Sequence, residues 1–164
     1  MVGAILKFNN WSKNIFKVLF KDIDISSWNL NINYWESYGN STMINDYNEL
    51  DYIDSENAKK ELIYDNSEVY PEFLELFINK ENEKIYNLKT YNDFIQSGCF
   101  LSLVIIDHRN IEICCKDVQL LKIIIDNFKK SILENKKIFV LDKIRLDAVI
   151  SAYRSSKEIN IFDI

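Results

Sequence analysis

The stretch CFLSLVIIDHRNIEICCKD, residues Cys99 to Asp117, contains the most informative pattern in this chain of 164 residues. Cys99 to Asp107 is apolar at both alternating sets of positions, which is typical of a strand in the centre of a sheet. A second apolar run, Ile111 to Cys115, follows after only three residues. The two runs therefore predict a hairpin with a short loop.

Helix signals flank this hairpin on both sides. Thr90 and Asp93 have the spacing of a capping box, and Gly98 is placed to end the helix, so a short helix is predicted over 91–97. Asp117 is expected to cap the longest helix, over about 117–135. Helical spacing predicts a buried stripe on it and lysines in solvent. The stripe is Leu121, Ile124, Ile125, Phe128 and Ile132, and the exposed residues are Lys122, Lys129 and Lys130.

The remaining elements follow from periodicity. Trp28 to Tyr34 alternates strictly between large apolar side chains and asparagines, which predicts a strand with one buried face. Helical spacing of Trp11, Ile15, Val18 and Leu19 predicts a helix over 11–21. Shorter patterns predict strands over 1–8, 73–78 and 137–141 and a short helix over 57–64, while 142–153 fits helix and strand equally.

These elements predict an α+β fold in a single domain spanning 1–164, with a tail over 154–164. The expected architecture is a mostly antiparallel sheet of about five to six strands. The two main helices, 11–21 and 117–135, are expected to pack on one face of that sheet. No linker or internal repeat divides the chain.

Composition limits the class of protein. With 48% hydrophobic residues, 13% aromatic residues and only three Gly and one Pro, the chain is a globular domain. Its longest apolar runs are far shorter than a membrane span, and its first ten residues do not form a signal peptide. We therefore expect a cytoplasmic protein without membrane contact, in which Cys99, Cys114 and Cys115 are reduced and buried.

The residues required by several familiar chemistries are missing. His108 is the only histidine. If Asp107 faces Ile111, Cys114 lies opposite Val104 and Cys115 opposite Leu103, more than about 10 Å from His108, which argues against a thiol–imidazole pair. The cysteines do not have zinc-ligand spacing, the acidic residues lack the spacing of a calcium loop, and the glycines are scattered singly. We expect no metal and no cofactor.

The uneven distribution of charge along the chain is its most unusual feature. The net charge of −5 combines +2 in residues 1–35, −10 in residues 36–83 and +3 in residues 84–164. We call residues 36–83 the acidic segment. Tyrosines are interspersed within it, and an acidic surface with aromatic side chains suits a basic protein partner. With a pI near 5 the chain is not expected to bind nucleic acid.

The leading hypothesis is a non-enzymatic protein-binding module, in the style of an immunity or inhibitor protein that blocks a basic toxin or nuclease. Its expected partner-binding residues are Asp46, Tyr47, Glu49, Asp51, Tyr52, Asp54 and Glu56. An acidic surface kept for solubility explains the same charges equally well. The oligomeric state stays open.

Two alternatives belong to other classes. The first is a small carboxylate-based or metal-dependent enzyme that uses two residues among Asp46, Glu49, Asp51 and Asp54. The second is a small-molecule binding domain with a pocket lined by the aromatic residues Trp28, Tyr34 and Trp35.

The stretch TYNDFIQSGCFLSLVIIDHRNIEICCKD, residues Thr90 to Asp117, resembles a family of small bacterial proteins from low-GC Gram-positive bacteria that is known only as a domain of unknown function. The shared features are the TYNDF helix start, the apolar strand ending in Asp and the Cys-Lys-Asp before a helix. Ser26-Ser27-Trp28 and Glu36-Ser37-Tyr38 also match, so the resemblance extends to about Tyr153. The acidic segment of this chain is longer than the corresponding part of the family pattern. The resemblance implies a fold and a bacterial setting, and it implies no activity.

Overall fold

The centre of the protein is one antiparallel sheet of six strands, in a computed structural model that describes residues 3–9, 14–38, 55–64, 70–80, 88, 90–107, 109–131 and 136–141. The strands follow the spatial order β2-β3-β4-β5-β1-β6. Their bounds are β1 Gly3–Lys7, β2 Asn29–Tyr38, β3 Tyr70–Asn79, β4 Cys99–Ile106, β5 Asn110–Cys115 and β6 Lys137–Leu141. The predicted α+β fold and the central position of β4 are confirmed.

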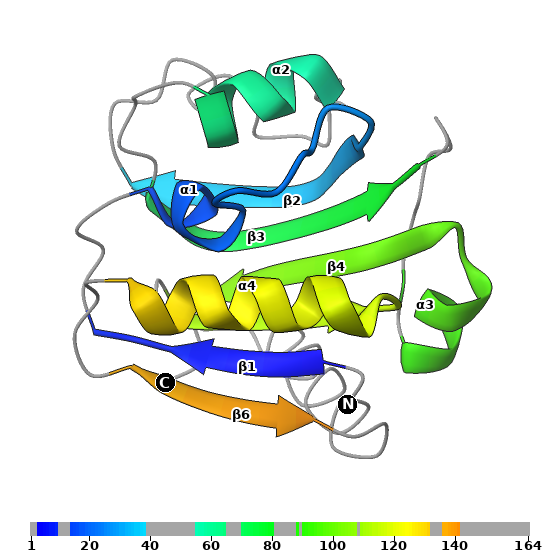
Figure 1. Cartoon of the computed structure of the whole chain (residues 1–164). Helices are drawn as coiled ribbons and strands as arrows, with labels where there is room; N and C mark the ends of the chain where they lie inside the picture. The colour runs from blue at the N-terminus through cyan, green and yellow to red at the C-terminus, as the bar shows by residue number, and fades with distance from the viewer. Residues whose placement is uncertain are drawn as a thin grey trace, which may run out of the picture.

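Helices cover one face of this sheet (Figure 1). They are α1 (Ile15–Leu19), α2 (Ser55–Lys59) with the π-helical turn η1 (Lys60–Tyr64), and α4 (Val118–Lys130). We call the face beneath them the helix-covered face. The short helix α3 (Tyr91–Gln96) instead packs at one end of the opposite face, which we call the second face.

Alternation along the strands builds two cores of unequal size. The larger cluster lies on the helix-covered face, where Leu76, Leu103 and Ile113 of successive strands are all fully buried. The smaller cluster lies on the second face. It contains Phe77, Leu88, Phe94, Cys99 and Cys114.

The two predicted N-terminal caps are present, whereas the predicted stop at Gly98 is replaced by a C-cap at Ser97 in extended backbone. Thr90 and Asp93 form a complete capping box on α3, which ends at Gln96 with Ser97 as the capping residue. The Asp117 carboxylate accepts from the backbone N–H groups of Gln119 and Leu120 at the start of α4. Four residues of the predicted stripe on α4 are buried, namely Leu121, Ile124, Ile125 and Phe128. Ile132 lies outside the described residues.

Helix α1 is shorter than the predicted helix over 11–21. Asn14 caps it, and Phe20 ends it. Asp22 then adopts a left-handed backbone with φ 61°, a conformation that Asp tolerates and that cannot continue a helix. The buried stripe includes Phe16 as well as the predicted Ile15 and Leu19.

The hairpin register differs from the expected one. Cys114 lies opposite Ser102 instead of Val104, and Cys115 opposite Leu101 instead of Leu103. The cause is a turn in which the N–H of Arg109 donates to the carbonyl oxygen of Ile106. Because each strand position shifts by an even step, the same residues still face the core.

No helix among the described residues is long and apolar enough to cross a membrane. The predicted strands over 1–8, 73–78 and 137–141 and the helix over 57–64 are present with small changes in their bounds. The ambiguous stretch 142–153 and the expected tail over 154–164 lie outside the described residues.

Candidate functional site

The acidic segment begins in the last residues of β2 and includes α2, η1 and the whole of β3, which pairs with β2 in the sheet. Of the seven predicted partner-binding residues, Glu56 on α2 is described. The other six lie outside the described residues, namely Asp46, Tyr47, Glu49, Asp51, Tyr52 and Asp54. The described residues of the segment are 36–38 in β2, 55–64 in α2 and η1, and 70–80 in and just after β3; of these, α2 carries the predicted partner-binding residue.

Apolar side chains hold α2 and η1 against the helix-covered face. Ala58 and Leu62 are fully buried in the larger core cluster. The side-chain Nδ2 of Asn14 donates to the carbonyl oxygen of Leu62 at 2.7 Å. The hydroxyl of Ser55 accepts from the backbone N–H of Leu30 at 3.0 Å. These contacts fix the helical part of the acidic segment beside β2 and α1.

Lys59 points inward from α2, and its side chain is 4% exposed. Its Nζ donates to the carbonyl oxygen of Ser26 at 3.0 Å and to Oε1 of Glu56 at 2.7 Å. A buried ammonium group requires such partners, because leaving one unpaired costs far more than a neutral polar group would. One of the three basic residues of the acidic segment is thus largely withdrawn from the surface.

The outward side of α2 and η1 carries acidic, basic and aromatic groups, because Lys60 is exposed as well as Glu56 and Tyr64. The side chain of Glu56 is 80% exposed, and Tyr64 is 57% exposed. An aromatic residue exposed to this degree is available for contact with another protein.

A second polar arrangement lies on the second face of the sheet. Glu75 on β3 and Glu112 on β5 both pair with Val104 of β4, so they share one row. Two strand spacings place their Cα atoms roughly 10 Å apart. The Nδ2 of Asn33 donates to Oε2 of Glu75 at 2.9 Å.

Burial raises the pKa of Glu112 to about 7, and the nearby charge of Lys7 opposes part of that rise. A carboxyl group with this pKa is able to give or take a proton near neutrality. Glu112 is only 7% exposed, however, which limits direct access by a substrate. Among the described residues, no acceptor lies within hydrogen-bond distance of the buried Nδ2 of Asn31, on the same face.

The cysteines are unsuited to nucleophilic chemistry. All three are buried thiols. Burial raises the pKa of the thiols of Cys99 and Cys115 to about 11, so both stay protonated at neutral pH. His108 lies outside the described residues. Within the described ranges, no three His, Cys, Asp or Glu side chains are grouped closely enough to hold a metal ion.

The alternatives from sequence can be placed only in part. Trp28, expected in an aromatic-lined pocket, is 6% exposed and packs edge-on against Phe20 and Phe100, with ring centroids 5.6 and 5.3 Å apart. The side chains of Tyr34 and Trp35 are not among those described. The four carboxylates considered for an enzyme also lie outside the described ranges, namely Asp46, Glu49, Asp51 and Asp54.

The burial of the charged residues Glu112 and Lys59 was not predicted from the sequence. A weak signal existed for Glu112, because it is the only charged residue inside the apolar run Ile111 to Cys115. Helical spacing puts Lys59 on the same side as Ala58 and Leu62 and Lys60 on the other, but the sequence does not show what would pair a buried lysine there.

The chain belongs to the family described as Protein of unknown function (DUF2691), whose model matches residues 1–145. This confirms the expected family of unknown function. No curated protein and no solved structure matched the chain. The matched range includes all six strands of the sheet and the whole acidic segment.

Proposed function

We propose that this family member is a non-enzymatic protein-binding module of the bacterial cytoplasm, which docks a basic partner through the acidic segment. A cationic toxin or nuclease is the kind of partner that fits, and the role is that of an immunity or inhibitor protein.

The observation that carries this proposal is the way α2 and η1 are built. Ala58 and Leu62 anchor them in the core, while Glu56 and Tyr64 face solvent. The fold thus holds part of the acidic segment in a defined position. A purely solubilising acidic loop would need no such anchor.

Charge and aromatic surface have separate roles in this proposal. The charge of −10 over residues 36–83 steers a cationic protein toward the segment and accelerates encounter. The exposed Tyr64 supplies contact area that binds after encounter, because tyrosine is among the residues that dominate binding energy at interfaces.

The test is affinity capture from a lysate of the native cell, with the full chain as bait and elution by a salt gradient. We expect a basic protein that elutes well below 1 M salt, because screening weakens exposed ion pairs. Its capture should be lost in the variant D46N/E49Q/D51N/D54N. The matched control D22N/D24N/D107N/D126N removes four exposed carboxylates outside the segment and should retain capture.

A captured partner that resists molar salt, or that the neutralised variant still binds, would contradict the proposal. Circular dichroism of both variants establishes that each remains folded. Substitution of Tyr64 by Ala should weaken binding of the captured partner with little change in its salt dependence, since it removes contact area and no charge.

A further inference from the structure

The two edges of the sheet differ in how their backbone groups are satisfied. At the edge formed by β2, the hydroxyl of Ser55 accepts from the N–H of Leu30 at 3.0 Å and donates to the carbonyl oxygen of Trp28 at 3.4 Å. Register shifts after Ile32 and Glu36 also make β2 irregular. Both features oppose the addition of a further strand beside β2.

The edge formed by β6 is open. Its five residues pair with β1 without a register shift. In an antiparallel pair only alternate residues bond to the neighbouring strand, so the other N–H and C=O groups of β6 point outward. Among the described residues, these backbone groups have no hydrogen-bond partner beyond β1. Such a row of groups is a template for one more strand.

Each face of β6 presents a half-exposed apolar side chain at this edge. Phe139, on the second face, is 47% exposed, and Val140, on the helix-covered face, is 49% exposed. The register assigns the faces, because Phe139 pairs with Ile5 of the smaller cluster and Val140 with Ala4 of the larger one. A strand added beside β6 would cover both, because its side chains also alternate between the two faces.

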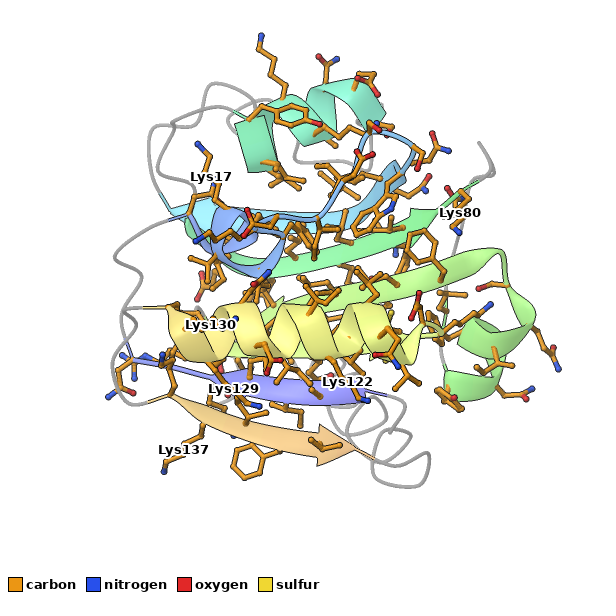
Figure 2. The ribbon with its side chains drawn as sticks, in the orientation of Figure 1. Lys17, Lys80, Lys122, Lys129, Lys130 and Lys137 are labelled. Carbon is orange, nitrogen blue, oxygen red and sulfur yellow. The ribbon has the colours of Figure 1, made fainter. Side chains whose placement is uncertain are left out.

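Exposed lysines accompany the apolar side chain on each face. On the second face, Lys137 pairs with Lys7, whose Nζ lies 5.7 Å from the centre of the Phe139 ring. On the helix-covered face, Lys122 and Lys129 lie on the flank of α4 toward β6 (Figure 2). The two faces thus combine the same kinds of group, one apolar side chain with two lysines.

The contacts of α4 explain the direction of Lys122 and Lys129. Asn127 donates to the carbonyl oxygens of Leu19 and Lys21, at the end of α1 and just after it. Helical spacing places both lysines on the side of α4 opposite Asn127, and therefore away from α1. On that side β6 lies beside β1, at the edge of the sheet (Figure 1).

The charge of these four lysines is only weakly neutralised. Asp126 pairs with Lys129 at 3.2 Å, but both side chains are more than half exposed, so this ion pair offsets little of the charge. The other three lysines make no ion pair within the described ranges. The edge of β6 is therefore positively charged on both faces of the sheet.

We propose that the open edge of β6 binds an extended, acidic segment of another protein, which adds a further strand to the sheet. The backbone of the segment bonds to the outward groups of β6. Two adjacent apolar side chains cover Phe139 and Val140, and flanking carboxylates meet the lysines on both faces. In this mode of recognition, main-chain hydrogen bonds provide affinity and alternate side chains provide specificity.

Two other occupants fit the edge less well. Pairing of β6 with β6 of a second copy would bring two sets of the four lysines together, and like charges on edge strands oppose such pairing. A nucleic acid offers charge but no row of backbone N–H and C=O groups to continue the sheet. The proposal goes beyond the proposed function, because β6 and β2 form opposite edges of the sheet.

The test uses the full chain and the synthetic peptide acetyl-EEVIEE-amide, which places an adjacent apolar pair between carboxylates. Anisotropy of the fluorescently labelled peptide measures binding at about 0.01 M ionic strength, where the Debye length is about 30 Å. We expect saturable binding. The peptide KKVIKK, with the same apolar pair and reversed charge, should bind at least about tenfold more weakly.

Variants of the chain locate the bound peptide. K122E/K137E should weaken binding at least about tenfold, because it reverses one lysine on each face. The matched control K21E/K80E reverses two exposed lysines away from β6 and should leave binding unchanged. F139T/V140T retains the lysines and removes the apolar contacts, and it should also weaken binding. Circular dichroism establishes that each variant remains folded.

A modified peptide separates strand addition from attraction of charge. N-methylation at the valine and the isoleucine of EEVIEE keeps every side chain but removes one backbone donor on each edge of the peptide, so binding should be lost. Equal binding of the methylated peptide would overturn the proposal. Absence of EEVIEE binding to the wild type, or binding that survives K122E/K137E, would overturn it as well.

The other occupants are recognised by their own signatures. Self-association of the wild type in sedimentation velocity that disappears in F139T/V140T would assign the edge to a second copy. A single-stranded oligonucleotide that displaces the peptide would assign the lysines to a nucleic acid. Either result would contradict the proposal. The variant D46N/E49Q/D51N/D54N should bind the peptide as the wild type does, so the outcome here is separate from that of the proposed function.

Discussion

The two faces of the sheet differ in how they are filled, and the difference separates stability from potential function. The helix-covered face is built from fully buried apolar side chains beneath α1, α2 and α4. The second face has a small apolar cluster under α3 and includes buried polar groups, among them Asn31, Ser102 and Glu112. Burying such groups costs free energy, so the second face contributes less to stability than its burial suggests.

The largest expected effect comes from breaking the helix-covered face. Phe128→Ala removes a fully buried ring that packs edge-on against Phe8. We expect the free energy of unfolding to fall by about 3 to 5 kcal/mol, measured by urea denaturation. Ile123→Ala on the same helix, 47% exposed, should change it by less than about 0.5 kcal/mol. Equal losses at the two positions would mean that α4 is not packed as described.

The next largest effect is expected on the second face. There a substitution should increase the free energy of unfolding instead of lowering it. Burial raises the pKa of Glu112 from its ordinary 4.5 to about 7 in the folded protein. Between these values the folded state binds the proton more tightly than the unfolded state does. The stability that Glu112 contributes is therefore present below pH 4.5 and lost as the pH rises through 7.

Glu112→Gln keeps the shape and removes the charge. At pH 8 we expect the variant to be more stable than the wild type, by on the order of 3 kcal/mol. Urea denaturation between pH 5 and pH 8 should show a decline in wild-type stability that is absent from the variant. A decline of equal slope in both proteins would assign it to other groups.

A smaller gain is expected from Asn31→Leu. The buried Nδ2 of Asn31 has no hydrogen-bond acceptor among the described residues, so an apolar side chain should raise the free energy of unfolding by about 1 to 2 kcal/mol. Asn33→Leu is the matched comparison, because Asn33 donates to Glu75. Its thermal midpoint should fall while that of Asn31→Leu rises. A lower thermal midpoint in both variants would show that the Nδ2 of Asn31 has a hydrogen-bond partner in solution.

The smallest effect should follow removal of a cap on the second face. Thr90→Ala breaks the capping box of α3 and should cost about 1 kcal/mol. Hydrogen exchange should be faster in α3 than in α4, whose own cap, Asp117, is intact. A uniform change across both helices would indicate that α3 unfolds only with the whole domain.

Much of the fold could be predicted because its signals are local. The capping residues Thr90 and Asp117 act within one helical turn, and the apolar run of β4 identifies a central strand wherever its neighbours lie. The hairpin register could not be predicted, because it depends on the turn at Asp107 to Arg109, where Asp107 takes a left-handed φ of 52°. Asp is one of several residues that tolerate this backbone, so its presence alone does not select it.

The candidate site was less predictable than the fold. The excess of negative charge was visible in the sequence, and the structure places Glu56 at the surface. The anchoring of α2 through Leu62 depends on Asn14, 48 positions away, and no periodicity reports such a contact. The same holds for Lys7 and Lys137, which lie far apart in sequence and become neighbours only in the sheet.

By itself, the sequence determined which segments form strands and helices, where the two main caps lie, and that the negative charge is concentrated in residues 36–83. Each of these depends on residues within a few positions of one another. The tertiary structure alone decided which charges are buried, which remain exposed and which gather beside β6. Lys59 and Lys60 are adjacent in sequence, yet one is buried against Ser26 and the other faces solvent, because burial depends on what the opposite side of the fold places there.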